Sequence, residues 1–165
     1  MKQIMLDLIV GKVSELPDVF SPNLVIVNLS SVYHKQYHHW EKASPSDHRC
    51  YVLHREEDLF SLNWVDGPAQ YFNYQDKGPE NVRFAIGFIA QALAKGKKVF
   101  ICCDQGQSRS PSIALLYLAF DNIINRESYQ KAKEDFMKFY PEYRPGEGIQ
   151  QFLSKHWSEI ILPYE

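Results

Sequence analysis

Residues 99–118 read VFICCDQGQSRSPSIALLYL, and they combine a strand pattern, a short loop and a helix pattern. The apolar run 99–101 is typical of a buried central strand. The mostly apolar residues 112–118 predict a buried helix. In the loop between them, Cys103 is followed after five residues by Arg109. Because a loop that leads from a strand into a helix N-terminus directs backbone N–H groups inward, this order predicts an anion-binding site.

Each residue type in this loop has a physical reason for its position. Gly106 allows a tight backbone turn, and Pro111 suits the first turn of a helix, where a missing N–H costs little. Arg109 offers a planar pair of donors that matches two phosphate oxygens. The positive charge of the helix N-terminus and of a nearby arginine favours the thiolate form of Cys103, which makes it a nucleophile. Ser110 can donate a hydrogen bond to that sulfur and help it leave in a second step.

The same residues also fit purely structural roles. Cys103 alone fits a small buried side chain, and Arg109 alone fits a surface charge at the start of a helix. Their joint spacing, with Gly106 between them and Ser110 after them, favours the functional interpretation over these separate ones.

The segment CCDQGQSRS resembles the signature loop of the cysteine-dependent protein tyrosine and dual-specificity phosphatases, Cys-x5-Arg-Ser/Thr. The ending SRSPSIALLYL is most similar to the dual-specificity branch, including its small bacterial and phage-type members. The resemblance extends from Leu59 to Trp157. The family usually has histidine immediately before the nucleophile, where this chain has Cys102. The resemblance implies a phosphate-binding loop made of Asp104, Gln105, Gly106, Gln107, Ser108 and Arg109.

Phosphoester cleavage also needs a proton donor for the leaving group, and a carboxylic acid on a loop can supply it. Asp66 lies 37 residues before Cys103, in the context Val-Asp-Gly-Pro, which resembles the acid-bearing loop of the bacterial members. Asp76 lies 27 residues before Cys103, but it also fits an Asn/Asp-type turn ahead of the next helix. We therefore expect Asp66 to be the general acid and keep Asp76 as the alternative.

The composition is that of an ordinary globular protein. The 165 residues are 45% hydrophobic and 23% charged, so we expect a single dual-specificity-phosphatase-like catalytic domain over residues 1–165. The net charge of −2 argues against broad electrostatic binding to nucleic acid or to acidic membranes. No apolar run reaches membrane-spanning length, and the first residues are too few and too acidic for a secretory signal. Three cysteines do not form a disulfide framework, so we expect a cytoplasmic protein.

Periodic patterns elsewhere in the chain predict the rest of the fold. Strand patterns occupy 4–10, 24–29, 50–54 and 59–64, and helix patterns occupy 79–96, 126–139 and 149–157. The helix at 79–96 leads straight into the strand that precedes Cys103, and such strand–helix–strand alternation is typical of parallel sheets. We therefore expect an α/β fold of one domain, with a central, mostly parallel twisted sheet flanked by helices.

The polar and aromatic segment 33–47 contains a possible metal-ligand pair. His34 and His38 are four residues apart and would share one face of a helix. No cysteine or carboxylate at a suitable spacing completes a metal site, so we expect a solvated surface segment. If that segment folds over the active site, Trp40 would contact substrate.

Two further roles stay open at this stage. A reversible disulfide would protect Cys103 from irreversible oxidation. A bridge to the adjacent Cys102 needs backbone strain, so Cys50 is the better partner if it lies near, and simple packing of buried cysteines is the alternative that we favour. Gln150 and Gln151 either position the hydrolytic water or are ordinary helix-surface residues, and the surface role is the default.

These residues together predict a two-step hydrolysis of phosphomonoesters through a phosphocysteine. Cys103 attacks phosphorus, Arg109 and the loop amides hold the oxygens, and Asp66 protonates the leaving group and then activates water. Because the loop supplies the charge stabilisation, we expect no metal and no cofactor. The resemblance implies phosphotyrosine, phosphoserine or phosphothreonine in proteins, or a small phosphoester, as substrate, and phosphate, sulfate or vanadate as ions that occupy the loop. The alternative is a catalytically impaired module that binds phosphate or phosphoproteins.

Two other cysteine-based classes fit less well. A sulfur-transfer enzyme of the rhodanese type also places its cysteine on a loop before a helix, but with a different loop length. Low-molecular-weight phosphatases and thiol-based arsenate reductases carry the cysteine near the N-terminus with the acid after it, and the order here is reversed. Members of the resembling family that act on inositol phosphates often carry extra basic residues in the loop. The loop here contains no lysine, so the resemblance implies less highly charged phosphoesters as substrates.

Overall fold

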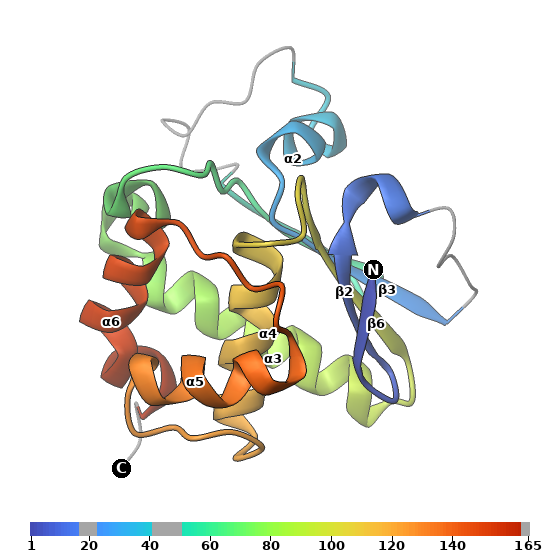
Figure 1. Cartoon of the computed structure of the whole chain (residues 1–165). Coiled ribbons are helices and arrows are strands. Elements are labelled where there is room, and N and C mark those ends of the chain that lie inside the picture. Colours follow the sequence, from blue (N-terminus) through green and yellow to red (C-terminus); the bar gives the residue numbers. More distant parts are fainter. Residues whose placement is uncertain (17–22, 41–50, 163–165) are drawn as a thin grey trace.

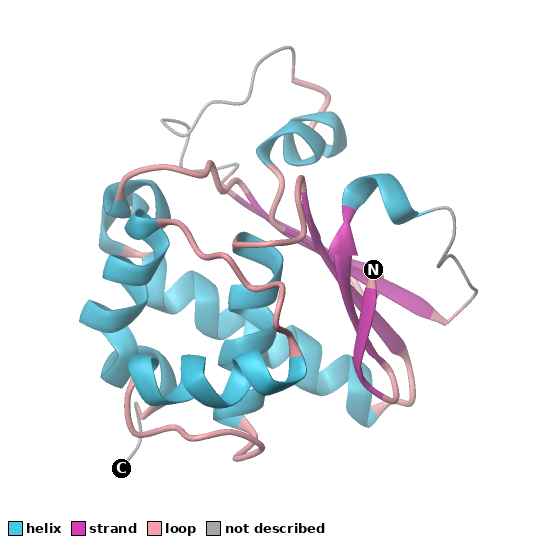
Figure 2. Cartoon of the chain, viewed as in Figure 1, coloured by secondary structure: helices cyan, strands magenta, loops and turns pink. Residues whose placement is uncertain are grey.

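A six-stranded sheet forms the centre of the fold. The computed structural model describes residues 1–16, 23–40 and 51–162, and within them the strand order is β1-β2-β6-β3-β5-β4. The strands are β1 (Lys2–Met5), β2 (Leu8–Lys12), β3 (Leu24–Asn28), β4 (Val52–Arg55), β5 (Leu59–Leu62) and β6 (Lys98–Cys103). The four inner strands run parallel, and β1 and β4 pair antiparallel at the two edges. The expected mostly parallel sheet is therefore confirmed (Figure 2).

Four helices pack together against one face of this sheet (Figure 1). They are α3 (Gly78–Ala94), α4 (Arg109–Phe120), α5 (Tyr129–Phe139) and α6 (Glu147–Ile161). Helix α4 contacts β6 and β2, and α3 contacts β6, β3 and β5, so the main core lies between these two helices and the sheet. The short helix α2 (Ser31–Tyr37) and the 3-10 helix η1 (Val13–Glu15) lie beyond the carboxyl ends of the parallel strands.

Strand β6 occupies the middle of the sheet because its sequence is apolar on both faces. Its residues 99–103 are all buried, as expected for a parallel strand that is covered on two sides. One face meets the main core, and the opposite face joins a smaller cluster of Val13, Phe100 and Cys102. The loop after β6 therefore starts from a rigid, buried position.

Two strand predictions need correction. The single strand predicted over 4–10 is wrong, because the chain turns at Leu6 and Asp7 and forms the hairpin β1–β2. Leu6 is 83% exposed in this turn, so its apolar side chain gave a misleading signal of continuous burial. The strand predicted over 50–54 is found as β4, two residues later at its start, and Cys50 lies outside the described residues.

Two helix boundaries also differ from the predictions. Helix α5 begins at Tyr129, not at 126, because Ser128 caps it: its Oγ accepts from the N–H of Lys131 at 3.2 Å. Helix α6 extends well past the predicted 149–157 and ends at Ile161, which is buried. In the part of the chain that the structure describes, no helix is long and apolar enough to cross a membrane.

Candidate active site

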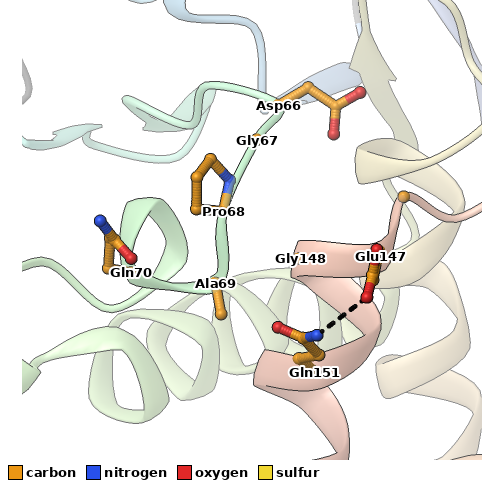
Figure 3. Close-up of a pocket in the computed structure, with 9 residues that line it drawn as sticks. Asp66, Gly67, Pro68, Ala69, Gln70, Glu147, Gly148 and Gln151 are labelled. Carbon is orange, nitrogen blue, oxygen red and sulfur yellow. Dashed lines mark hydrogen bonds between the residues drawn. The ribbon is translucent and has the colours of Figure 1, made fainter.

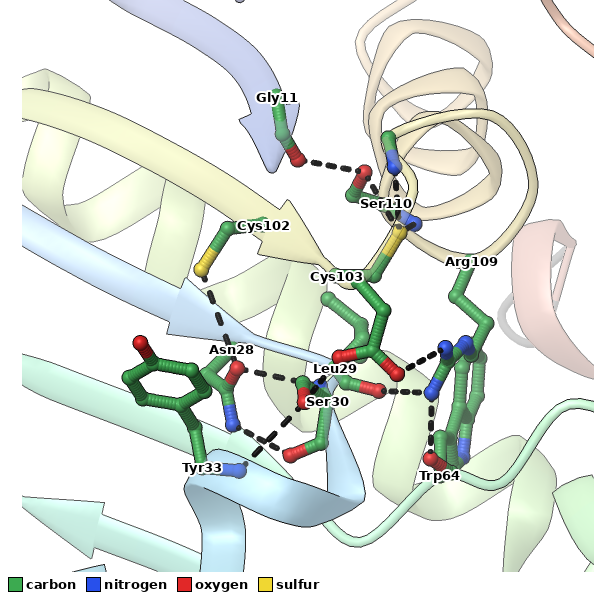
Figure 4. Close-up of polar contacts among 12 residues, drawn as sticks. Gly11, Asn28, Leu29, Ser30, Tyr33, Trp64, Cys102, Cys103, Arg109 and Ser110 are labelled. Atoms are coloured by element: carbon green, nitrogen blue, oxygen red, sulfur yellow. Dashed lines mark hydrogen bonds and ion pairs between the residues drawn. The ribbon is translucent and has the colours of Figure 1, made fainter. Parts of the chain in front are cut away.

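The loop that follows β6 wraps around the sulfur of Cys103 (Figure 4). The backbone N–H groups of Gly106 and Ser110 donate to Cys103 Sγ at 3.3 and 3.4 Å. The thiol in turn donates to Ser110 Oγ at 3.2 Å. Cys103 is only 1% exposed, so these contacts dominate its surroundings. The loop thus surrounds the sulfur with hydrogen-bond donors, which is the environment that a nucleophilic thiolate needs.

The hairpin β1–β2 supports this loop from the side opposite Arg109 (Figure 4). The Ser110 hydroxyl donates to the Gly11 carbonyl at 3.2 Å, a distance equal to that between Ser110 Oγ and Cys103 Sγ. A hydroxyl carries one proton, so Ser110 can turn it from the carbonyl to the sulfur when the sulfur is charged. Gly106 has a φ of +68°, and a Cβ there would lie 3.2 Å from the Gly11 carbonyl carbon, so glycine is strongly favoured.

Arg109, at the start of α4, is held by three fixed acceptors. Its Nη1 donates to the carbonyls of Leu29 at 3.1 Å and Trp64 at 2.8 Å, and its Nη2 donates to Asp104 Oδ2 at 3.0 Å. A guanidinium has five N–H donors, so two of them, Nε–H and one Nη2–H, are left over. Within the described residues no hydrogen bond is assigned to those two. Two N–H groups of one guanidinium are the kind of donor pair that matches two oxygens of a phosphate.

Asp104, the residue directly after the cysteine, connects Arg109 to the start of α2. Ser30 Oγ donates to Asp104 Oδ1 at 2.5 Å, and the same Ser30 caps α2 by accepting from the N–H of Tyr33 at 3.4 Å. Burial alone would raise the pKa of the Asp104 carboxyl, but the hydrogen bond from Ser30 and the charge of Arg109 outweigh it, so the pKa lies below its usual value. The carboxylate is therefore charged at neutral pH.

The segment between α5 and α6 contacts the other side of the loop. The Tyr140 hydroxyl donates to the Gly106 carbonyl at 2.7 Å. The backbone N–H of Arg144 donates to the Gln107 carbonyl at 2.7 Å. The side chains of Gln105 and Gln107 are exposed. These contacts hold the loop backbone and leave its glutamine side chains in solvent.

Asp66 lies beside the phosphate loop, on the segment that follows β5. A Cβ on Gly146 would be 3.2 Å from Asp66 Oδ1 and 4.0 Å from Ser108 Oγ, so the carboxylate and the end of the loop approach the same point. The N–H of Gly146 donates to Ser108 Oγ at 3.1 Å, which ties α6 to the loop. Asp66 lines a groove of about 610 Å³ between its segment and the start of α6. Figure 3 shows how the residues that line this groove lie.

Asp76 lies in the short 3-10 helix η4 (Tyr74–Asp76), immediately before α3. Its Oδ1 accepts from Asn73 Nδ2 at 3.4 Å, and Asn73 Oδ1 accepts from the N–H of Gly78. Asp76 is thus part of an Asn/Asp turn at a helix start, as its alternative interpretation predicted. The structure therefore places Asp66 next to Gly146, whose N–H bonds to Ser108 of the loop, whereas the carboxylate of Asp76 bonds to Asn73.

Gln150 and Gln151 have helix-surface contacts. Gln150 Nε2 donates to the Pro145 carbonyl at 3.3 Å, and its Oε1 accepts from Lys133 Nζ at 2.9 Å. Gln151 Nε2 donates to Glu147 Oε1 at 3.2 Å on the same helix (Figure 3). Both amides bond to groups outside the loop that follows β6, which favours the default surface role, although Gln151 also lines the groove beside Asp66.

The histidine pair on α2 differs from the prediction. His34 is fully buried, and its Nδ1 lies 2.7 Å from Ser61 Oγ, so the prediction of a solvated segment is wrong for this residue. The reason is the position of α2 over β5, which the helix contacts. Trp40 stacks on the ring of His38, with centroids 4.6 Å apart. The described residues contain no group of three His, Cys, Asp or Glu side chains that would hold a metal ion.

Cys102 faces away from the phosphate loop, because successive side chains of a strand point to opposite faces. Its Sγ donates to Asn28 Oδ1 at 3.8 Å (Figure 4), and it packs with Val13 and Phe100. Burial, together with the charges of Cys103 and Asp104, raises the pKa of the Cys102 thiol. Both Cys102 and Cys103 are free thiols. Cys50, the other candidate partner of Cys103, lies outside the described residues.

Sequence reasoning missed several residues that build the site. Leu29 and Trp64 contribute only backbone carbonyls, which leave no signature in the side-chain pattern. Tyr140 also lies far along the chain from the loop that it contacts. Ser30 did leave a signal, since serine directly before a helical segment is a typical N-cap, but its bond to Asp104 depends on the fold.

No protein-family model matches this chain, and no curated protein matches its sequence. Solved structures of other proteins do match its fold. The similar structures include dual-specificity and tyrosine phosphatases and a human tyrosine phosphatase-like serine/threonine/tyrosine-interacting protein. The chain therefore has the α/β fold of these phosphatases, as the resemblance of its loop implied. The narrower expectation of a bacterial or phage-type member stays a prediction.

Three of these structures illustrate the likeness. Human DUSP28 is 16% identical with a TM-score of 0.64, and the match covers 99% of this chain and 100% of that one. The Cydia pomonella PTP-2 phosphatase is 19% identical with a TM-score of 0.62, over 93% and 87% of the two chains. PTPMT1 in complex with PI(5)P is 17% identical with a TM-score of 0.61, over 98% and 97%. At these identities the comparison establishes the fold.

Proposed function

We propose that this chain is a cysteine-dependent phosphatase that hydrolyses phosphomonoesters, with phosphotyrosine, phosphoserine or phosphothreonine in proteins as substrate. The observation that carries the proposal is the ring of donors around Cys103 Sγ, with two N–H groups of Arg109 left for an oxyanion. The likeness in fold to the dual-specificity phosphatases supports it. A thiolate nucleophile needs a reducing compartment, so we propose that the protein acts in the cytoplasm.

The first step transfers the phosphoryl group to the enzyme. The Cys103 thiolate attacks phosphorus, an S–P bond forms, and the P–O bond to the leaving group breaks. Asp66, in its acid form, gives its proton to the leaving oxygen. Arg109 and the loop N–H groups bind the three remaining oxygens and stabilise the charge that spreads over them in the transition state. These groups supply the charge stabilisation, so the step needs no metal ion.

The second step releases phosphate. Water attacks the phosphorus of phosphocysteine, and the Asp66 carboxylate accepts a proton from that water. The S–P bond breaks, and Ser110 turns its hydroxyl from the Gly11 carbonyl to the departing sulfur of Cys103, which leaves as a thiolate. The equal distances from Ser110 Oγ to the two acceptors allow this change without movement of the loop.

A phosphate- or phosphoprotein-binding module is the second candidate, and Cys102 is the observation that favours it. The resembling family usually has histidine at this position, to order the loop. Cys102 instead contacts Asn28 and apolar side chains on the opposite face of the strand. If other contacts of the loop do not replace those of the histidine, the chain binds phosphate groups but does not hydrolyse phosphoesters.

Hydrolysis of p-nitrophenyl phosphate, measured against pH with EDTA and a reductant present, tests the proposal. We expect metal-free activity in the unmodified chain. Cys103→Ser should lower kcat by about 10⁴-fold or more, because it removes the nucleophile. Asp66→Asn should lower kcat by about 10²- to 10³-fold through loss of the acid. Asp76→Asn is the matched control and should change kcat by less than about threefold.

The contrary results are specific. Loss of activity with Asp76→Asn but not with Asp66→Asn would transfer the acid role to Asp76. Full activity of Cys103→Ser would refute the phosphocysteine mechanism. Absence of turnover in the unmodified chain, with vanadate still bound, would establish the binding module.

A further inference from the structure

Asp104 places a fixed negative charge inside a loop that is built to bind anions. Its carboxylate is held on both oxygens, by Ser30 on Oδ1 and by Arg109 on Oδ2. The side chain is 40% exposed, whereas that of Arg109 is 7% exposed. The carboxylate therefore borders solvent, whereas the guanidinium does not.

A bound phosphate would lie very close to this carboxylate. Asp104 already accepts one N–H of Arg109 Nη2, and the proposed phosphate accepts the other. Two acceptor oxygens that each lie about 3 Å from the nitrogen of one NH₂ group are about 5 Å from each other. Arg109 therefore balances two anions at once, and one of them is part of the protein.

We propose that Asp104 is a specificity-determining residue, whose charge makes this site favour substrates that carry one phosphate over those with a second phosphate next to the first. The inference rests on the proposed function, since it concerns the same loop. The single scissile phosphate is compensated by the loop N–H groups and by Arg109. A neighbouring phosphate would meet the Asp104 carboxylate, and none of the six positions from Asp104 to Arg109 is a lysine that could neutralise it.

Asp104→Asn separates the charge of this residue from its position. The amide oxygen can still accept from Arg109 Nη2, and the amide N–H₂ can donate to Ser30 Oγ, which has a lone pair available. The substitution thus keeps the shape and both contacts and removes one negative charge. Any change in selectivity then reports the charge and not a displaced Arg109.

The experiment measures binding of inositol monophosphate and of a vicinal inositol bisphosphate by calorimetry, in the Cys103→Ser background at low ionic strength. Asp104→Asn should tighten the bisphosphate about fivefold more than the monophosphate, as expected for two charges about 8 Å from a carboxylate in water. At high salt the difference should disappear. Asp121→Asn, an identical change about 18 Å away at the far end of α4, should leave the ratio of the two affinities unchanged.

The outcomes separate this inference from the proposed function. Equal tightening of both ligands by Asp104→Asn, or the same shift with Asp121→Asn, would overturn the role of Asp104 even if the chain hydrolyses phosphoesters. The selective shift without any turnover in the unmodified chain would retain the role and refute hydrolysis. Failure to bind either ligand would overturn the role of Asp104 toward a second phosphate, while hydrolysis would still be decided by the p-nitrophenyl phosphate assay. If Asp104→Asn does not fold, Asp104→Glu, which keeps the charge, should retain the original ratio, and a changed ratio would overturn the proposal.

Discussion

Cys102 and Cys103 are adjacent in the chain, yet they have opposite surroundings. The sulfur of Cys103 is surrounded by N–H and O–H groups of the loop. The sulfur of Cys102 lies among apolar side chains, with one contact to an amide oxygen. The alternation of a β-strand causes this difference, since one residue along the strand changes the face. It also separates the two sulfurs and leaves no geometry for a bridge between them.

This difference predicts selective alkylation. Burial raises the pKa of the Cys102 thiol, so in the folded protein it stays neutral above the pH at which a free cysteine ionises. In the Cys103→Ser variant we expect no labelling of Cys102 by iodoacetamide at pH 9, and full labelling after unfolding in urea. Tandem mass spectrometry of the peptide 99–109 reads the site. Rapid labelling of Cys102 in the folded variant would contradict its buried placement.

At the scale of elements, the start of α6 sets the position of the loop that carries Asp66. A Cβ on Gly148 would lie 1.9 Å from the Gly67 carbonyl oxygen and 2.8 Å from the Pro68 carbonyl carbon. Backbone therefore touches backbone at this contact, and only glycine permits it. Since the N–H of Gly146 also bonds to Ser108 Oγ, α6 links the Asp66 segment to the phosphate loop.

Gly148→Ala should separate these two elements. The added methyl group must displace backbone atoms, so we expect the free energy of unfolding to fall by about 3 kcal/mol, with a lower kcat because Asp66 moves. Gly87→Ala is the control, since Gly87 lies within α3 with no atom within 4 Å of its Cβ position. It should stabilise the protein by about 0.5–1 kcal/mol. Urea unfolding measures both, and equal stability of the two variants would contradict the close contact.

At the scale of the whole molecule, buried tyrosines connect the core to the site. The Tyr143 hydroxyl forms hydrogen bonds with the hydroxyls of Ser112, at 2.7 Å, and Tyr129, at 3.1 Å. The Tyr140 hydroxyl donates to the Gly106 carbonyl of the loop. Burial raises the pKa of Tyr129 and of Tyr140 to about 12. The stability of the core and the geometry of the loop thus both depend on buried tyrosine hydroxyls that remain neutral.

These shifts predict a loss of stability at alkaline pH. A tyrosine ionises near pH 10 in the unfolded chain but near 12 in the folded one, so the unfolded state loses its proton first. The contribution is fully present below about pH 10 and is lost as the pH rises to about 12. Urea midpoints from pH 7 to 12 measure it. Tyr140→Phe should lose less stability over this range, and a midpoint that stays constant to pH 12 would contradict the shifts.

Sequence alone was sufficient to predict the tight loop between β6 and α4, because its geometry is local. Cys103, Gly106, Arg109 and Ser110 lie within eight consecutive residues, and a strand followed by a helix determines where their backbone groups point. The central parallel strands and α3 followed for the same reason, from the periodicity of neighbouring residues. The predictions failed where a local signal was ambiguous, as at the exposed Leu6 in the hairpin turn.

Only the tertiary structure decided which distant groups meet this loop. The order β2-β6-β3-β5 places the end of β3 beside the end of β6, and the end of β5 one strand further along the same edge. This brings Ser30 to Asp104 and Trp64 to Arg109 across 74 and 45 residues of sequence. It also brings Asp66 and Ser108 close to the same residue, Gly146. Such contacts depend on how strands pair and helices pack, which are sums of many weak interactions and leave no signature at the individual positions.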